Sequence, residues 1–414
     1  MKVVHLNTNL DISSAPYKLH KALTEGGYDS ALLTLNESGL DGAYHYNHSF
    51  FFKLFRRLGS IKRKRLLKKY NRKPNMIFSA APFGVNIQNM PVIRESRIIC
   101  IHWVSADFLS PGAIKGLLDT GKRIIVFCHD NNHFTGGCHV RMGCEGYKTL
   151  CGACEMLGSD DKNDISHSLC LRKKEIYKNR NNLCVISPSK WMDGNVAASQ
   201  VFMDIPHYVC PNAVDTAVFK HYDCAKAREI LGLTTDKRII LVAIKKNQDI
   251  PYNGMEYLKA VYNRINSEYE NRQNVCWVFF GTDTLSEDYK ENSVNMGFIK
   301  KQEQLSLLYA AADVYLTTSL EDSFNQSVAE CLSCGTPVVA FDNGGIADIV
   351  NAGNGYLARL RDCEDLYNGL TAGVSGKLPV MSAPDISRDI EERFGYKAVC
   401  RRFTDILTDM GFNK

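Results

Sequence analysis

Long hydrophobic runs are missing from this sequence of 414 residues. Its apolar runs are strand-sized and fall far short of the roughly 20 residues that a membrane span needs. The first residues also have too short an apolar core for a signal peptide. The net charge is only +5, which argues against a dedicated nucleic-acid binder. No repeat of fixed period and no low-complexity tract is present.

Several catalytic patterns are absent as well. No G-x-G-x-x-G follows the first apolar run, which disfavours a dehydrogenase. No Ser–His–Asp or Cys–His arrangement is evident, so a covalent nucleophile is not indicated. An Asp-x-Asp metal motif does not occur in a suitable context.

The sequence does contain an alternation of short apolar runs and helical stretches. Runs that are apolar on both faces suit parallel strands covered by helices, so the expected fold class is α/β with doubly wound parallel sheets. Prolines at positions 206 and 211 indicate a break near the middle of the chain. We therefore expect domains at 1–207 and 208–385 and a single closing helix within 386–414. The expected strands are Val3–Leu6, Ala31–Leu35, Ile98–Trp103, Ile124–Cys128, Leu183–Ser187, Ile239–Ile244, Val275–Phe280, Val314–Thr317 and Pro337–Phe341.

One charge block stands out at residues 51–73. From Lys53 to Lys73 the chain has eleven Lys or Arg and no acidic residue. The spacing of its apolar residues predicts one face of a helix. A basic amphipathic helix binds a membrane surface or an anionic ligand, or it is a surface helix whose apolar stripe packs on the first domain. Gly59-Ser60 is expected to weaken or split it. The stripe consists of Phe51, Leu54, Phe55, Leu58 and Ile61.

Residues 313–350 carry the sharpest chemical pattern. Asp322 and Glu330 are eight positions apart in an expected strand–loop–helix unit. A carboxylate at 322 can face the crevice at the carboxyl end of a strand, where open α/β sheets bind ligands. Glu330 can accept two hydrogen bonds from a diol such as a ribose. Gly344-Gly345 lets backbone approach a ligand at the start of a further helix, whose N–H groups favour phosphate.

This run resembles the carboxyl-terminal signature of retaining family-4 glycosyltransferases, which have the GT-B fold of two Rossmann-like domains facing across a cleft. The resemblance implies that Asp322 contacts the donor sugar and Glu330 the ribose. Asp322 stands where the family has Glu, and Asn253 where it has Lys, so one cation of the phosphate site is missing. The implied donor-binding residues are Lys245, Lys246, Asn253, Gly281, Gly297, Ser323, Phe324, Asn325, Ser327, Gly344 and Gly345.

The first half offers two further candidate regions. Ser13, Ser14 and Ala15 stand where related sequences often have Gly-Gly-Ala beside phosphate or acceptor. The alternative is that a serine only caps the first helix. His129 follows an expected strand, and the resemblance gives it a contact with the donor sugar; a buried histidine bonded to backbone is the alternative. His102 ends the preceding strand and is placed on the acceptor side.

An insert at 131–160 contains four closely spaced cysteines. Cys138, Cys144, Cys151 and Cys154 follow the spacing C-x5-C-x6-C-x2-C, which is typical of a structural zinc site. The alternative is reduced or paired cysteines that hold a loop. The insert, with its Thr-Gly-Gly-Cys, resembles that of a subgroup of the family that makes capsule, colanic acid and O-antigen.

Taken with this resemblance, the expected function is retaining transfer of a sugar from a nucleotide-diphosphate sugar to a lipid-linked or oligosaccharide acceptor in bacterial surface polysaccharide biosynthesis. No cofactor is expected to be required for catalysis, and no nucleic acid is an expected partner. The expected location is cytoplasmic, with the basic helix at an anionic membrane surface. Two alternatives are a sugar-nucleotide epimerase or hydrolase of GT-B fold and an inactive carbohydrate-binding subunit.

Overall fold

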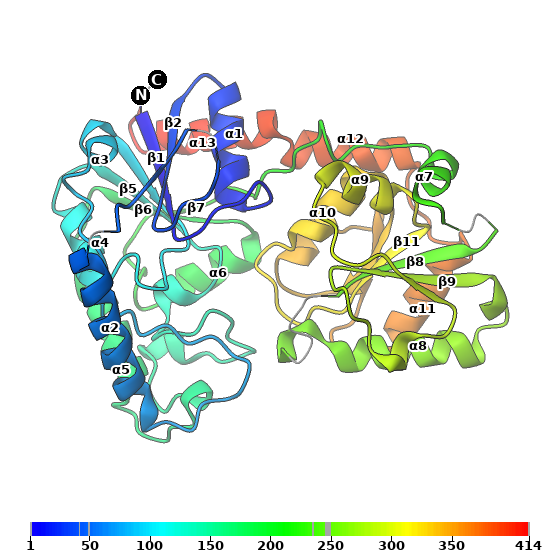
Figure 1. Ribbon diagram of the computed structural model, residues 1–414, viewed down its shortest axis with the longest axis horizontal. Coiled ribbons are helices and arrows are strands. Elements are labelled where there is room, and N and C mark those ends of the chain that lie inside the picture. The colour runs from blue at the N-terminus through cyan, green and yellow to red at the C-terminus, as the bar shows by residue number, and fades with distance from the viewer. Residues whose placement is uncertain (1, 41, 49, 234–235, 245–249, 413–414) are drawn as a thin grey trace. The chain divides into compact units, whose positions relative to one another are not determined.

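The computed structural model describes residues 2–40, 42–48, 50–233, 236–244 and 250–412 (Figure 1). The chain divides into two compact units. Unit 1 comprises Met1–Ala213 and Val399–Lys414, and unit 2 comprises Val214–Ala398. These borders lie 6 and 13 residues beyond the expected ones at 207 and 385.

Unit 1 is built on a seven-stranded parallel sheet in the order β3-β2-β1-β4-β5-β6-β7. Every residue of β4 and β6 is buried, so both faces of the sheet are covered, as the continuous apolar runs predict. The order reverses between β1 and β4, which is where sheets of this kind bind ligands. The strands are β1 (Lys2–Asn7), β2 (Asp29–Thr34), β3 (Ala43–His45), β4 (Ile98–Ile101), β5 (Arg123–Phe127), β6 (Leu183–Ser187) and β7 (His207–Val209).

Unit 2 repeats this plan with a six-stranded parallel sheet in the order β10-β9-β8-β11-β12-β13. The switch in strand order lies between β8 and β11. Apolar residues from both sides of the sheet form the core of the unit. The strands are β8 (Arg238–Ala243), β9 (Val275–Phe280), β10 (Ser293–Asn295), β11 (Val314–Thr317), β12 (Val338–Phe341) and β13 (Gly355–Ala358). The expected fold class of two doubly wound parallel sheets is confirmed.

Helices alternate with the strands in both units (Figure 1). Those that lie wholly in unit 1 are α1 (Ala15–Glu25), α2 (Phe50–Lys68), α3 (Pro91–Glu95), α4 (Pro111–Leu118), α5 (Ile165–Tyr177) and α6 (Lys190–Ala198). Those of unit 2 are α7 (Cys224–Leu231), α8 (Met255–Glu268), α9 (Gln302–Ala310), α10 (Gln326–Ser333), α11 (Cys363–Val374) and α12 (Ala383–Phe394). Among the described residues, no helix is both long and apolar enough to cross a membrane.

The closing segment consists of two helices rather than one. α12 ends before Gly395, and α13 (Tyr396–Asp409) follows at once. α13 begins in unit 2, and from Val399 onward it belongs to unit 1. There the hydroxyl groups of Tyr28 and Thr404 are 2.8 Å apart, and Phe403 is fully buried.

The basic segment forms the single helix α2, which ends at Lys68. The expected break at Gly59-Ser60 is therefore wrong. A Cβ at Gly59 would lie 2.5 Å from Cβ of Phe83. The glycine thus lets the helix backbone pack closely on the body of unit 1, and this contact outweighs the low helix propensity of glycine.

Candidate active site

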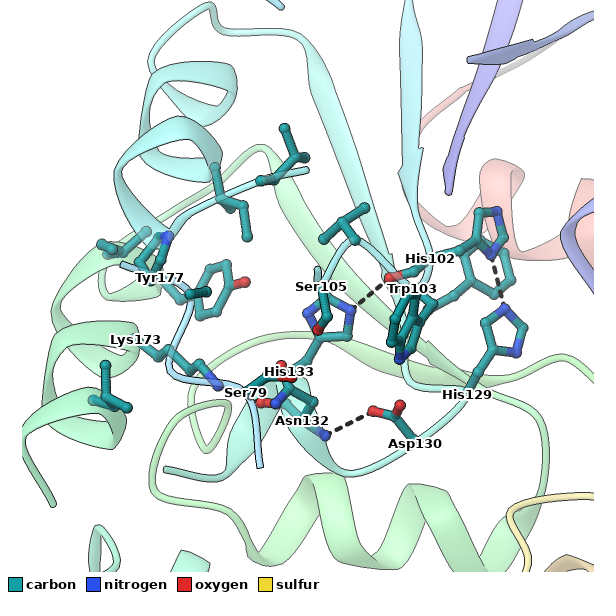
Figure 2. A pocket seen from close by; sticks show the side chains of 18 of the residues that line it. Ser79, His102, Trp103, Ser105, His129, Asp130, Asn132, His133, Lys173 and Tyr177 are labelled. Carbon is teal, nitrogen blue, oxygen red and sulfur yellow. Dashed lines mark hydrogen bonds between the residues drawn. The ribbon is translucent and has the colours of Figure 1, made fainter. Parts of the chain in front are cut away.

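Three histidines form a row at the switch point of the unit 1 sheet. His5 lies in β1, His102 directly follows β4, and His129 lies two residues beyond β5. His5 Nδ1 is 3.0 Å from His102 Nε2, and His102 Nδ1 is 2.8 Å from His129 Nε2; Figure 2 shows the second contact. The structure thus brings the predicted His102 and His129 together and adds His5, which sequence reasoning missed. The available signal was a lone imidazole inside an apolar strand.

Burial lowers the pKa of all three imidazoles, because a charged ring would lose its hydration. The pKa of His5 falls to about 3 and that of His129 to about 4. Burial also lowers the pKa of His102 well below its usual value, and the neighbouring His129 and His5 lower it further. All three rings are therefore neutral near pH 7.

A cavity lies beside this row, and Figure 2 shows the side chains that line it. Lys173 reaches it from α5, and its Nζ donates hydrogen bonds to the carbonyl oxygens of Asn132 and Thr135. Asp130 Oδ1 accepts a hydrogen bond of 2.8 Å from the Asn132 backbone N–H, and Asp130 Oδ2 lies 2.6 Å from Nδ1 of the buried His139. These bonds fix the loop that follows β5, on which His129 sits. Lys173 and His139 were not predicted, because Lys173 comes from a helix and His139 from an insert in which only the cysteines carried a recognisable spacing.

The serine loop after β1 closes on itself. Asp11 Oδ1 accepts hydrogen bonds from Ser13 N at 2.9 Å and Ser13 Oγ at 2.6 Å. Ser14 Oγ donates to the Asp11 carbonyl at 2.6 Å. Ser14 is the N-cap residue of α1, which starts at Ala15, but its side chain makes no capping bond. The side-chain cap considered for these serines is therefore not formed.

In unit 2, the two predicted acids lie at the carboxyl end of β11. Glu330 is in the second turn of α10 and is only 5% exposed. Asp322 lies in the preceding loop, and its Oδ1 accepts hydrogen bonds from the backbone N–H groups of Phe324 (3.2 Å) and Asn325 (2.9 Å). Asn325 caps α10 by accepting a bond from Val328 N with its Oδ1. One oxygen of Asp322 is thus used to shape the loop, a role that the spacing did not predict.

Gly344 and Gly345 bring a second loop against the first. Gly345 N donates to the Asp322 carbonyl at 2.8 Å. A Cβ at Gly344 would lie 2.3 Å from the Asp322 carbonyl oxygen, and one at Gly345 would lie 2.1 Å from that of Ser323. The two glycines are therefore required by the contact between the loops. They begin a five-residue 3-10 helix, Gly344–Asp348, and not the expected α-helix.

Other predicted donor residues lie along the same carboxyl edge. Thr318 Oγ1 donates to the Asn253 carbonyl at 3.0 Å, and Gly281 N donates to the Gly297 carbonyl at 2.8 Å. Asn253, Asn325 and Ser327 line one cavity with Thr318 and Ser319. Ser323 is half-buried and Phe324 is buried. Lys245 and Lys246, the predicted phosphate ligands, lie outside the described residues.

Four thiols of the insert line one cavity in unit 1: Cys138, Cys144, Cys151 and Cys154. Each is a free cysteine, so the alternative of paired cysteines does not hold in this structure. Among the described residues, however, no three Cys, His, Asp or Glu side chains are placed to hold one metal ion. As arranged here the thiols do not form a zinc site, and zinc binding stays a prediction that rests on the spacing. Zinc content of the purified protein would decide it.

The outer face of α2 combines apolar and cationic side chains. The predicted stripe residues Leu54, Phe55, Leu58 and Ile61 are between 41 and 52% exposed, so the alternative that this stripe packs on unit 1 is wrong for them. The side chain of Phe51 lies outside the described part of the structure. A different line of the helix packs inward: Phe52 and Leu67 are buried, and Arg63 Nη1 lies 2.6 Å from Oδ1 of the buried Asp107.

Comparison with known families adds an independent finding. Residues 238–373, most of unit 2, match the family described as glycosyl transferases group 1. The chain is 23% identical over 365 residues to the putative colanic acid biosynthesis glycosyl transferase WcaC of Escherichia coli, with 86% of each chain covered. It is also 26% identical over 288 residues to an uncharacterized glycosyltransferase of Methanocaldococcus jannaschii, covering 64% of this chain and 70% of that one.

Solved structures share the fold over the whole chain. A glycosyltransferase of Rickettsia africae superposes with a TM-score of 0.64 at 13% identity, with 100% of this chain and 99% of that one covered. Anabaena HepE, solved in complex with UDP and glucose, superposes with a TM-score of 0.59 at 16% identity, covering 99% and 100%. With its two parallel sheets, the chain has the GT-B fold.

Proposed function

We propose that this chain, whose residues 238–373 form a group 1 glycosyltransferase domain, transfers a sugar from a nucleotide-diphosphate sugar to a glycan acceptor with retention of configuration. The observation that carries the proposal is the set of interlocked loops at the carboxyl edge of the unit 2 sheet, around Asp322 and the buried Glu330. In open α/β sheets, ligands bind at the carboxyl ends of the strands where the strand order reverses. In unit 2 this point lies between β8 and β11. The name of WcaC supports a role in bacterial surface polysaccharide synthesis, and the UDP and glucose found in HepE support a nucleotide-sugar donor.

In this proposal each acid has a separate task. Glu330 accepts hydrogen bonds from the ribose hydroxyls, and the second oxygen of Asp322 contacts the donor sugar. His129 of unit 1 also contacts the donor. Lys245, Lys246 and the backbone N–H groups of the loops stabilise the charge of the departing diphosphate, which is the main electrostatic requirement of such a transfer. The protein's own groups supply this stabilisation, so a chelator is expected to leave transfer unchanged.

The test is a screen of nucleotide sugars by thermal shift, because a ligand that binds the folded state raises Tm. The best donor is then supplied with candidate acceptors, and the anomeric configuration of the product is determined. Asp322→Ala and Glu330→Ala are expected to lose transfer by at least about 100-fold. Glu291→Ala, an acid outside the site, is the control. Transfer that survives both site variants would refute the assignment, and donor turnover without any acceptor would indicate an epimerase or hydrolase.

We propose a separate role for the outer face of α2. It binds the anionic inner surface of the cytoplasmic membrane. Its exposed apolar side chains would be buried at the boundary between lipid headgroups and acyl chains, and the surrounding cations would attract lipid phosphates. Each Lys or Arg near such a surface contributes about 1 kcal/mol. A groove on this face is lined by Leu58, Ile61, Leu66 and three cations, Lys62, Arg65 and Lys69.

This role is tested by sedimentation with vesicles. The wild type is expected to bind vesicles rich in phosphatidylserine more strongly than neutral ones and to detach at high salt. Phe55→Glu combined with Leu58→Glu should abolish that binding. Met203→Glu is the matched control, since Met203 is 54% exposed on unit 1 outside this helix. Equal binding by the wild type and the double variant would refute the role of α2.

A further inference from the structure

Three polar side chains in the cavity of Figure 2 have hydrogen-bonding capacity that the described residues leave unused. Ser105 lies in the loop after β4, His133 in the 3-10 helix Asn132–Phe134, and Tyr177 at the end of α5. Ser105 and His133 are each 7% exposed and Tyr177 is 2% exposed. Within the described ranges, Ser105 Oγ, His133 Nδ1 and the Tyr177 hydroxyl have no hydrogen-bond partner. Buried polar groups are normally paired, so these three indicate a site for a ligand.

The second ring nitrogen of His133 is a hydrogen-bond acceptor. His133 Nε2 lies 2.8 Å from the His102 carbonyl oxygen, a contact drawn in Figure 2. A carbonyl oxygen can only accept, so Nε2 carries the proton. Burial lowers the pKa of His133, so the ring is neutral near pH 7 and Nδ1 is bare. A ligand has to bring a hydrogen-bond donor to this nitrogen.

The two hydroxyl groups can supply donors to the same ligand. Burial raises the pKa of Tyr177 above its ordinary value, so the phenol keeps its proton. Figure 2 shows its hydroxyl turned into the cavity, toward the side on which Ser105 and His133 lie. A carbonyl oxygen has two lone pairs and can accept from both hydroxyl groups. The complement of the three side chains is therefore one N–H or O–H donor together with one carbonyl oxygen.

Lys173 also lines the cavity, but its charge is already engaged. Its Nζ donates to the carbonyl oxygens of Asn132 and Thr135, and Asp130 interacts with it electrostatically. A carboxylate ligand would in addition bring only acceptors, which leaves His133 Nδ1 without a donor. We therefore expect the ligand group to be neutral.

The remaining wall of the cavity requires apolar atoms. It includes the aliphatic side chains of Leu109, Ile114, Leu169 and Ile176. Pockets of this kind bind groups that bury apolar surface and make a few directed hydrogen bonds. A single hydroxyl group can make the bonds but brings no apolar part. An acetamido group has one N–H, one carbonyl oxygen and one methyl group, and so meets every requirement.

We propose that this cavity binds the acetamido group of an N-acetylated sugar. The amide N–H donates to His133 Nδ1, the carbonyl oxygen accepts from Tyr177 and Ser105, and the methyl group packs on the aliphatic wall. The cavity belongs to unit 1, whereas the donor loops belong to unit 2. The inference rests on the proposed function in taking this sugar to be part of the glycan acceptor. Binding of the sugar does not require transfer, so the two proposals can fail separately.

The first experiment measures binding without transfer. The probes are the methyl glycosides of N-acetylglucosamine and N-acetylgalactosamine, and the matched controls are methyl glucoside and methyl galactoside. Saturation-transfer NMR should show the strongest transfer at the acetyl methyl group. Titration should give an affinity at least about 10-fold higher for an N-acetylated glycoside than for its hydroxyl counterpart, because the counterpart lacks the methyl contact and the amide bonds. The proposal is overturned if neither N-acetylated glycoside binds better than its counterpart.

The second experiment assigns the binding to this cavity. Tyr177→Phe removes the hydroxyl but keeps the ring, whose centroid lies 5.0 Å from that of Phe202. It should weaken binding of the N-acetylated glycoside about 3- to 10-fold and leave that of the hydroxyl counterpart unchanged. Ser105→Ala should act in the same direction. Tyr289→Phe is the control, since Tyr289 is a 4% exposed tyrosine of unit 2. Unchanged affinity in Tyr177→Phe, or an equal loss for both glycosides, would overturn the proposal.

Folding, binding and transfer are kept apart in these tests. Each variant is first compared with the wild type by its unfolding transition, and Ser105→Ala serves if Tyr177→Phe does not fold. If the wild type transfers no sugar from any donor, the proposed function fails while the binding data still decide whether the cavity takes an acetamido group. If sugar is transferred equally well to an N-acetylated acceptor and to its hydroxyl counterpart, this inference fails and the proposed function stands.

Discussion

The two units build their candidate sites from different parts of the chain. In unit 1 the site is held by side chains: three imidazoles bond ring to ring at 2.8 and 3.0 Å. In unit 2 it is held by backbone, because loops meet at glycines where a Cβ would lie 2.0 to 2.3 Å from a carbonyl oxygen, as at Gly254, Gly344 and Gly345. In unit 1, stability should therefore depend on the chemistry of the histidine side chains. In unit 2, stability and donor affinity should depend on the absence of any side chain at these glycines.

At neutral pH the largest expected effect comes from Gly345→Ala. Its added Cβ meets the Ser323 carbonyl, so the two loops must separate, which costs about 1–3 kcal/mol in unfolding free energy. The matched control is Gly194→Ala in α6, where a Cβ meets nothing within 4 Å. Chemical unfolding of both variants and titration with the best donor measure the effect. If Gly345→Ala matched Gly194→Ala in both stability and donor affinity, the backbone account of unit 2 would be wrong.

The next effect is a loss of stability in acid from the histidine row of unit 1. The folded-state pKa of His5 is about 3 and that of His129 about 4, whereas the ordinary value is about 6.5. The unfolded chain therefore binds more protons than the folded one below pH 6.5, and stability is lost as pH falls toward 4. Each histidine contributes at most about 1.4 kcal/mol per pH unit.

This acid effect is isolated by comparing the wild type with His5→Phe. The unfolding free energy of the wild type should fall more steeply between pH 6.5 and pH 4, because the variant lacks one of the titrating rings. Carboxylates contribute equally to both proteins and cancel in the difference. Parallel curves across this range would show that burial of His5 does not control its protonation.

The smallest expected effect is that of Ser14→Ala in the loop after β1. Among the residues that the structure describes, the half-exposed Ser14 Oγ bonds only the carbonyl of Asp11, so the loss should stay within about 0.5 kcal/mol. Donor affinity should not change measurably. A loss of affinity comparable to that of Gly345→Ala would mean that this loop of unit 1 also binds the donor through its exact backbone shape.

Periodicity predicted the interior of both sheets but not their edges. β6, β9 and β11 have the expected bounds, because each is a continuous apolar run between breaks. The four missed strands, β3, β7, β10 and β13, are three or four residues long and lie at the edges of the sheets. An edge strand has a neighbouring strand on one side only and is more exposed to solvent. Its sequence therefore needs no unbroken apolar run, and a search for such runs does not detect it.

The positions of the candidate site residues were predictable where they follow the ends of strands. His102, His129, Asp322 and Glu330 lie near the carboxyl ends of β4, β5 and β11. Residues that reach the site from elsewhere were missed, since Lys173 comes from the middle of a helix. The orientation of α2 could not be predicted either. Two faces of this helix carry apolar residues, one with Leu54 and Leu58 and the other with Phe52 and Leu67. Only the packed structure shows that the second face is the buried one.

The course of α13 has a consequence for the order in which the chain folds during synthesis. Unit 1 includes Val399–Lys414, but these residues are made only after all of Val214–Ala398. At the usual rate of translation, roughly 10 to 40 seconds separate the two parts of unit 1. Throughout that time the surface around Gly26 that Cys400 covers stays bare. Unit 1 is therefore still incomplete when synthesis of unit 2 ends.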